Sequence, residues 1–189
     1  MKVNPPYKPL IQMRSCCLPC SILWILHRRG YWIDQESIAK ELKLRFPKKA
    51  AILFNEKMLV AKKGQGIGAK NIIGKEAHLV GSLFRKHKIP LKMTTFRISK
   101  VGNPRKFILD NMRRGNDIML SFNWKGLDRK HNQGHVVVLS EISPKDILTL
   151  GDPSPMSANF WKVPLDRIIK AMGMEYDGCE RGFYIFSEK

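Results

Sequence analysis

Residues 134–152 read GHVVVLSEISPKDILTLGD, and this stretch decides the fold. Two apolar runs rich in β-branched residues flank Ser143-Pro144, a pattern typical of two antiparallel strands joined by a tight turn. His135 begins the first strand and Asp152 follows the second, so pairing of the strands brings these two side chains side by side. The stretch therefore predicts an antiparallel sheet with a polar pair at one end.

Further strands and several helices are expected around this hairpin. Five strands are expected in total, over 91–98, 117–123, 135–141, 146–150 and 182–188, and the third and fourth of them form the hairpin. Helices are expected over 19–29, 34–46 with Asp34 or alternatively Ser37 as N-cap, 69–87, 104–114 and 163–173, and an irregular basic stretch over 47–68. Because the strands follow one another without crossover helices, we predict an α+β fold with N-terminal helices packed on a C-terminal antiparallel sheet.

The composition is that of a folded chain with an extreme charge. The 189 residues predict one domain over 1–189, and the absence of a long apolar run predicts a cytoplasmic protein without a membrane span. The formal net charge is +18, and residues 41–130 hold 22 basic but only 6 acidic residues. Such a region attracts polyanions or acidic proteins, with binding that weakens steeply as salt rises.

A cysteine at the start of an apolar helix is the sharpest candidate for chemistry. Cys17 stands two residues before Pro19, a residue that suits the first helical turn. The positive end of the helix dipole and its free N–H groups favour a thiolate, which is the nucleophilic form. A thiolate needs a base and a group that orients the base, and His135 and Asp152 are the candidates. The neighbouring Cys16 remains an alternative nucleophile.

Four short motifs carry a resemblance to a known family. In chain order they are Gln12, Cys17-Leu18-Pro19-Cys20-Ser21, Gly134-His135-Val136-Val137-Val138 and Asp152-Pro153 followed by Phe160-Trp161. This order resembles the papain-like cysteine peptidases. It is most similar to the peptidases that remove double-glycine leaders from bacteriocin precursors, and to their free-standing relatives, in which the first long motif reads Cys-Gly-Pro-x-Ser.

The resemblance implies a papain-like fold and a hydrolase that cleaves a peptide or amide bond through an acyl-enzyme. It implies that Cys17 is the nucleophile, His135 the base and Asp152 the orienting group, and that Gln12 donates to the oxyanion with the Cys17 backbone N–H. No metal or organic cofactor is implied, and the partner is a peptide or protein substrate, for which the charge favours an acidic one. Leu18 replaces the family's Gly, which predicts a narrower or reshaped cleft, and Gln12 lies one residue nearer to Cys17 than is usual.

Other interpretations of the same residues stay open. The fold can serve as a basic binding module for nucleic acid or an acidic protein, with catalysis weak or lost. Cys17-Leu18-Pro19-Cys20 also matches the Cys-x-x-Cys of thioredoxin-like oxidoreductases. A zinc site would combine Cys16, Cys17, Cys20 and Cys179, and a weak phosphate-loop pattern spans residues 64–68.

Overall fold

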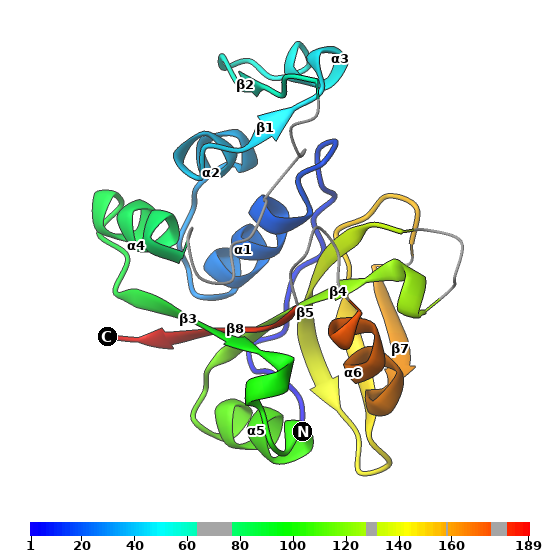
Figure 1. Ribbon diagram of the computed structural model, residues 1–189. Helices are drawn as coiled ribbons and strands as arrows, with labels where there is room; N and C mark the ends of the chain where they lie inside the picture. Colours follow the sequence, from blue (N-terminus) through cyan, green and yellow to red (C-terminus); the bar gives the residue numbers. More distant parts are fainter. Residues whose placement is uncertain (64–76, 128–131, 158, 175–180) are drawn as a thin grey trace.

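One antiparallel sheet separates two layers of helices. The computed structural model describes residues 1–63, 77–127, 132–157, 159–174 and 181–189 (Figure 1). The helices are α1 (Cys17–Arg28), α2 (Gln35–Glu41), α3 (Lys48–Ala51), α4 (Ala77–Lys86), α5 (Pro104–Arg113) and α6 (Leu165–Gly173), with short 3-10 helices η1 (Ile98–Lys100) and η2 (Trp124–Gly126). The strands are β1 (Arg45–Phe46), β2 (Leu59–Val60), β3 (Leu91–Arg97), β4 (Asp117–Asn123), β5 (Gly134–Ile142), β6 (Ile147–Gly151), β7 (Phe160–Pro164) and β8 (Gly182–Glu188).

The main sheet has six strands in the order β3-β8-β4-β5-β6-β7, and each neighbouring pair is antiparallel. The hairpin expected from the sequence is formed by β5 and β6, and the backbone N–H of Ser143 closes it by donating to the carbonyl of Ile147 at 2.9 Å. The five strands expected from the sequence all form, within one residue at each end. The predicted α+β class is therefore confirmed.

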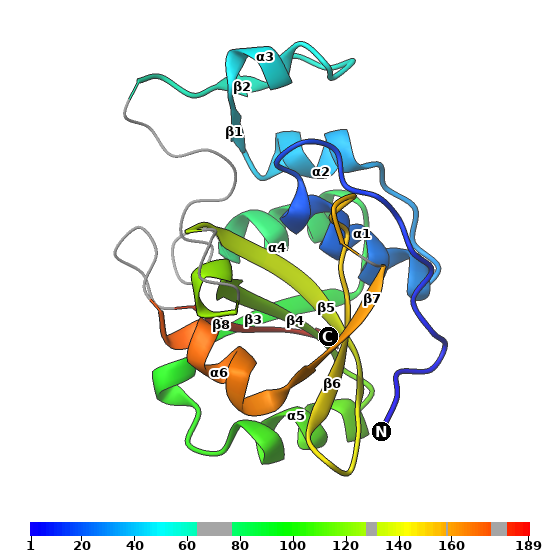
Figure 2. The same ribbon diagram turned by 90° about the vertical axis from the view of Figure 1, so that its right-hand side faces the viewer.

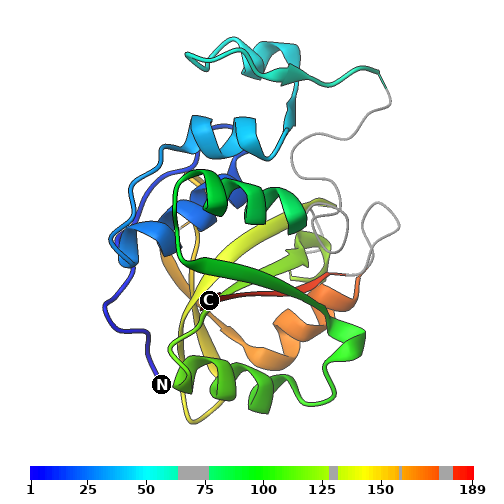
Figure 3. The same cartoon turned by 90° about the vertical axis from the view of Figure 1, so that its left-hand side faces the viewer.

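Helices cover both faces of this sheet (Figures 2 and 3). One face carries α1, α2 and α4, and the other carries α5 and α6. Helix α1 is the most deeply buried, since Ile22, Trp24 and Ile25 are each fully enclosed. The hydroxyl of Ser21 donates to the carbonyl of Val136 at 3.2 Å, which ties the start of α1 to the start of β5. This contact brings the N-terminus of α1 close to His135.

The structure differs from the sequence expectations between residues 34 and 63. The Asp34 side chain caps α2 as predicted, accepting from the backbone N–H of Ser37 at 2.8 Å. The helix ends at Glu41 rather than at residue 46, because Lys43 adopts a left-handed φ of 52° and reverses the chain. The stretch expected to be irregular contains α3 and β2, and β2 pairs in parallel with β1. Strand β7 was likewise not predicted.

Over the ranges that the structure describes, none of the helices combines the length and the apolar character that crossing a membrane requires.

A glycine sets how closely α1 approaches β6. A Cβ atom at Gly151 would lie 2.4 Å from Cζ3 of Trp24 and 2.8 Å from Cγ2 of Val138. We expect Gly151→Ala to lower the free energy of unfolding by about 1–3 kcal/mol, since a buried methyl group must displace these side chains. Urea unfolding measures this loss. The control is Gly102→Ala, where no atom lies within 4 Å of the added carbon. Equal stability of the two variants would contradict the proposed contact.

Candidate active site

The first turn of α1 presents one accessible thiol between two buried ones. Cys17 begins the helix and is half-buried, whereas Cys16 and Cys20 are fully enclosed. Burial is the main cause that raises the pKa of Cys16 and of Cys20 to about 12, so both thiols stay protonated near neutral pH. Of these three residues, only Cys17 is exposed enough to act on a substrate, which favours it over Cys16 as the nucleophile.

The hairpin ends bring His135 and Asp152 into direct contact. The Nε2 atom of His135 lies 2.7 Å from Oδ1 of Asp152. The same carboxylate accepts from the backbone N–H of Ser154 at 2.9 Å and from Nε1 of Trp161 at 3.0 Å. Burial acts to raise the pKa of Asp152, but the hydrogen bond and charge of His135 and the Ser154 N–H outweigh it and lower that pKa. Asp152 is therefore a fixed anion that holds one edge of the imidazole.

The Cys17 thiol interacts with the same ring. Burial lowers the pKa of His135, yet hydrogen bonds with Asp152 and with the Cys17 thiol, together with their charges, outweigh burial and raise that pKa to about 9. Since Nε2 is bonded to Asp152, Nδ1 is the nitrogen that remains for the sulfur. A pKa of about 9 would keep this buried ring largely protonated near neutral pH, beside the Asp152 carboxylate.

Aromatic side chains enclose the imidazole. The indole of Trp124 stacks on His135 with ring centroids 5.2 Å apart, and Phe122 meets it edge-on at 5.8 Å. Trp161, the donor to Asp152, stacks on Trp124 at 5.8 Å. These rings keep water from the His135–Asp152 hydrogen bond, which strengthens it. The resemblance drew attention to Trp161, but the role of Trp124 was missed, because only the pairing of β4 with β5 reveals its position.

The chain before α1 is held against the site from two sides. The backbone N–H of Gln12 donates to the carbonyl of Pro153 at 2.8 Å, next to Asp152. The side chain of Gln35 binds the residues on either side of Gln12, accepting from the N–H of Met13 at 2.9 Å and donating to the carbonyl of Ile11 at 2.8 Å. Gln35 carries no sequence signal for this role.

Gln12 and Leu18, at which the chain departs from the family motifs, are half-buried and buried respectively. The Oε1 atom of Gln12 is buried and has no hydrogen-bond partner among the described residues. Leu18 is enclosed in the core with α1, so its side chain does not narrow the surface beside Cys17 as the sequence suggested.

The stability of the fold should depend on the protonation of His135. Its pKa in the folded state, about 9, lies above the usual value of 6.5, so folding favours the protonated ring. This stabilisation is complete below pH 6.5 and is lost as pH rises through about 9. We expect the free energy of unfolding in urea to fall across this window. His87→Gln, which changes an exposed histidine, should retain the fall, whereas a fall that persists in His135→Gln would exclude His135 as its cause.

The described residues give less support to a thioredoxin-like site or a zinc site at the start of α1. A thioredoxin-like protein needs a strand directly before its Cys-x-x-Cys, and residues 3–16 form none. Within the described ranges, no group of three or more His, Cys, Asp or Glu side chains could hold a metal ion. Cys179 and the glycine-rich residues 64–68 lie outside the described residues.

The antiparallel sheet, the buried helix that begins at a cysteine, and the His–Asp pair at the hairpin ends define the class of papain-like cysteine peptidase folds. The chain is similar in structure to a double glycine motif protease from an AMS/PCAT transporter, crystallised in complex with the leader peptide. The two share 15% sequence identity with a TM-score of 0.51, and the match covers 100% of this chain and 98% of that one. No family model and no curated protein matches the sequence. The resemblance seen in the short motifs is thus confirmed at the level of the fold.

Proposed function

We propose that this chain is a cysteine peptidase in which Cys17 is the nucleophile, His135 the general base and acid, and Asp152 the group that orients the imidazole. The observation that supports this proposal is that His135 interacts with both groups, since its Nε2 atom lies 2.7 Å from an Asp152 oxygen and its pKa responds to the Cys17 thiol. A helix N-terminus and an imidazolium are the two surroundings that most favour a reactive thiolate. Residues 1–189 supply every group in this proposal and would act as one peptidase domain.

The reaction would proceed in two halves. The Cys17 thiolate attacks the carbonyl carbon of the substrate, and the resulting oxyanion accepts hydrogen bonds from the backbone N–H of Cys17 and the side-chain amide of Gln12. His135 then gives its proton to the departing amine, which leaves an acyl group on the sulfur. In the second half, neutral His135 takes a proton from water, the hydroxide attacks the thioester, and the thiolate returns with the product acid.

The substrate proposed here is a peptide. The structurally similar protease acts on a double glycine motif and was crystallised with a leader peptide. By that likeness we propose that this chain cleaves peptides after a pair of small residues, and its net charge of +18 favours acidic segments beside that pair. The three free cysteines at the start of α1 suit a reducing compartment such as the cytoplasm.

Mapping of alkylated thiols tests the proposal without any substitution. The native protein is treated briefly with iodoacetamide near neutral pH, digested, and its cysteine peptides are identified by mass spectrometry. We expect modification at Cys17 before Cys16 or Cys20, since both of these are buried with a pKa of about 12. In parallel, acidic peptides with an internal Gly-Gly pair are screened for cleavage. Rapid alkylation of Cys17 without any cleavage would favour the binding-module interpretation, and preferential alkylation of Cys20 would exclude the proposed site.

A further inference from the structure

Residues 45–63, which comprise β1, α3 and β2, project from the end of the helical layer that contains α2 (Figures 1 and 3). We call this stretch the apical segment. It takes no part in the main sheet and contributes nothing to the candidate active site described above. Some of its apolar side chains are buried, but others are exposed to solvent, and the exposed ones need an explanation.

The apical segment has a small core and a separate apolar surface. Phe46, Ala50, Phe54 and Met58 point inward and are buried, and the rings of Phe46 and Phe54 pack 4.6 Å apart. Four aliphatic side chains instead face solvent, with exposed fractions of 75% for Ile52, 63% for Leu53, 50% for Leu59 and 47% for Val60. Single exposed apolar side chains are common on protein surfaces and need no explanation. Four of them on one short projecting segment are more typical of an interaction site.

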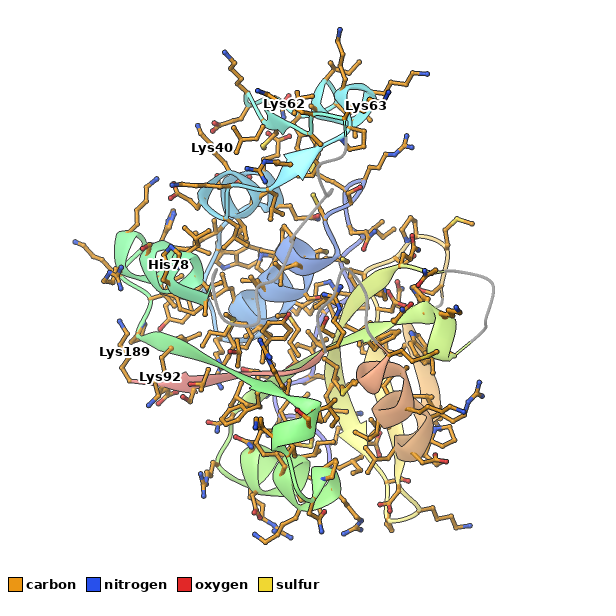
Figure 4. All side chains as sticks on the ribbon, viewed as in Figure 1. Lys40, Lys62, Lys63, His78, Lys92 and Lys189 are labelled. Atoms are coloured by element: carbon orange, nitrogen blue, oxygen red, sulfur yellow. The ribbon has the colours of Figure 1, made fainter. Side chains whose placement is uncertain are left out.

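Basic side chains are exposed on the same segment. The exposed basic side chains of the apical segment are Arg45, Lys48, Lys49, Lys57, Lys62 and Lys63. Its one acidic residue, Glu56, forms an ion pair with Lys40 of α2. Figure 4 shows Lys62 and Lys63 at the apical segment and Lys40 on the helix below it. The combination of exposed aliphatic side chains with an excess of basic over acidic residues is complementary to an anionic, apolar partner.

Hydrogen bonds hold the apical segment in place on α2. The Glu36 carboxylate accepts from the backbone N–H of Asn55 at 3.0 Å, from the Asn55 side-chain amide at 3.3 Å, and from the N–H of Glu56 at 3.3 Å. With the Lys40–Glu56 ion pair, these bonds fix the turn that follows Ile52 and Leu53. The aliphatic residues are therefore presented on a fixed support, which reduces the entropy lost on binding.

We propose that the apical segment binds the surface of an anionic lipid bilayer, with Ile52, Leu53, Leu59 and Val60 entering the headgroup region and the lysines contacting lipid phosphates. A second copy of the chain is disfavoured as the partner, since each copy brings the same cationic surface and a net charge of +18. Nucleic acid would use the lysines but leave the aliphatic side chains in water. A bilayer satisfies both sets of side chains, and flexible lysines suit its diffuse negative potential.

Vesicle sedimentation tests this proposal with the full chain. Vesicles of equal parts phosphatidylglycerol and phosphatidylcholine are compared with phosphatidylcholine alone at moderate salt. We expect binding to the anionic vesicles only. Lys48→Glu with Lys49→Glu should weaken binding by about 25-fold or more, since each lysine near an anionic surface contributes about five-fold. Ile52→Ser with Leu53→Ser should also weaken it, and this loss should persist when salt is lowered.

Matched substitutions elsewhere provide the controls. Met156→Ser removes an exposed apolar side chain far along the chain, and Lys145→Glu reverses an exposed charge at the β5–β6 turn. Both controls should bind vesicles like the unmodified protein. The proposal is overturned if anionic vesicles are not bound, or if the serine variants bind as well as the unmodified protein. Salt-sensitive binding of duplex DNA with no vesicle binding would assign these lysines to nucleic acid instead.

Discussion

Replacing Cys17 with Ala is expected to abolish both peptide cleavage and the rapid reaction with iodoacetamide. The sulfur is the atom that forms the proposed acyl-enzyme, and no other thiol at the start of α1 is accessible to replace it. Cys20→Ala is the matched control, because Cys20 is one turn along the same helix, fully buried, with its thiol 3.5 Å from the carbonyl of Leu10. It should retain most of the activity. If the two variants lose activity equally, the pair acts as a unit and the peptidase proposal is wrong.

His135→Ala is the second arm of this experiment. The loss of the proposed general base and acid should slow cleavage by about 10²–10⁴-fold, and should also slow alkylation of Cys17 because a thiolate there would lose its cationic partner. In the unmodified protein, kcat/KM for the proposed cleavage should decline as pH rises through about 9, where His135 loses the proton that the leaving amine requires. Because Asp152 raises the pKa of His135, Asp152→Asn should move this decline to lower pH. If the decline in kcat/KM stays at the same pH in Asp152→Asn, a group other than His135 controls it.

Replacing Asp117 with Ala is expected to cause the largest loss of stability. This carboxylate is fully buried at the start of β4, where it accepts from the hydroxyl of Tyr7 at 2.6 Å and pairs with Arg28 at 3.0 Å and with Arg29. Burial, followed by the charge of Asp117, raises the pKa of Tyr7 well above its usual value, so its hydroxyl remains a donor. Removal of the carboxylate leaves two largely buried guanidinium groups without their counter-ion.

Breaking such a pair costs about 3–5 kcal/mol in the free energy of unfolding. Urea unfolding of Asp117→Ala measures the loss directly. The control is Asp110→Ala, since Asp110 pairs with Lys106 and Arg113 at the surface, where screening by water leaves little to lose. If both variants unfold at the same urea concentration, the buried cluster at the end of α1 does not stabilise the fold as described.

The parts of the site that follow from local sequence were predictable, and those that depend on distant packing were not. His135 and Asp152 could be paired from strand length and one turn, because antiparallel pairing leaves a hairpin few alternatives. Cys17 could be placed at a helix start from Pro19 and the apolar run that follows. Trp124 reaches His135 only through the register of β4 with β5, which pairs Phe122 with His135. A single sequence contains no local signal of that register.

The chain that follows α1 shows the same division between predictable and unpredictable features. The Asp34 cap was predictable from its residue type, but the end of α2 was not, because Lys43 takes a left-handed conformation that glycine usually supplies. The helical pattern continued to Phe46, whereas that residue instead packs on Phe54 within the apical segment. Tertiary packing outweighed helix periodicity there.

The first turn of α2 connects the apical segment to the chain segment that precedes Cys17. The Gln35 side chain forms hydrogen bonds with the residues on both sides of Gln12. The next residue, Glu36, accepts a hydrogen bond from Asn55 of the apical segment. Adjacent side chains of one short helix thus bind two segments that lie far apart in the sequence. The segment that leads into Cys17 and the apical segment are therefore both positioned by the first turn of α2, so a substitution at this turn would disturb both ends of the layer.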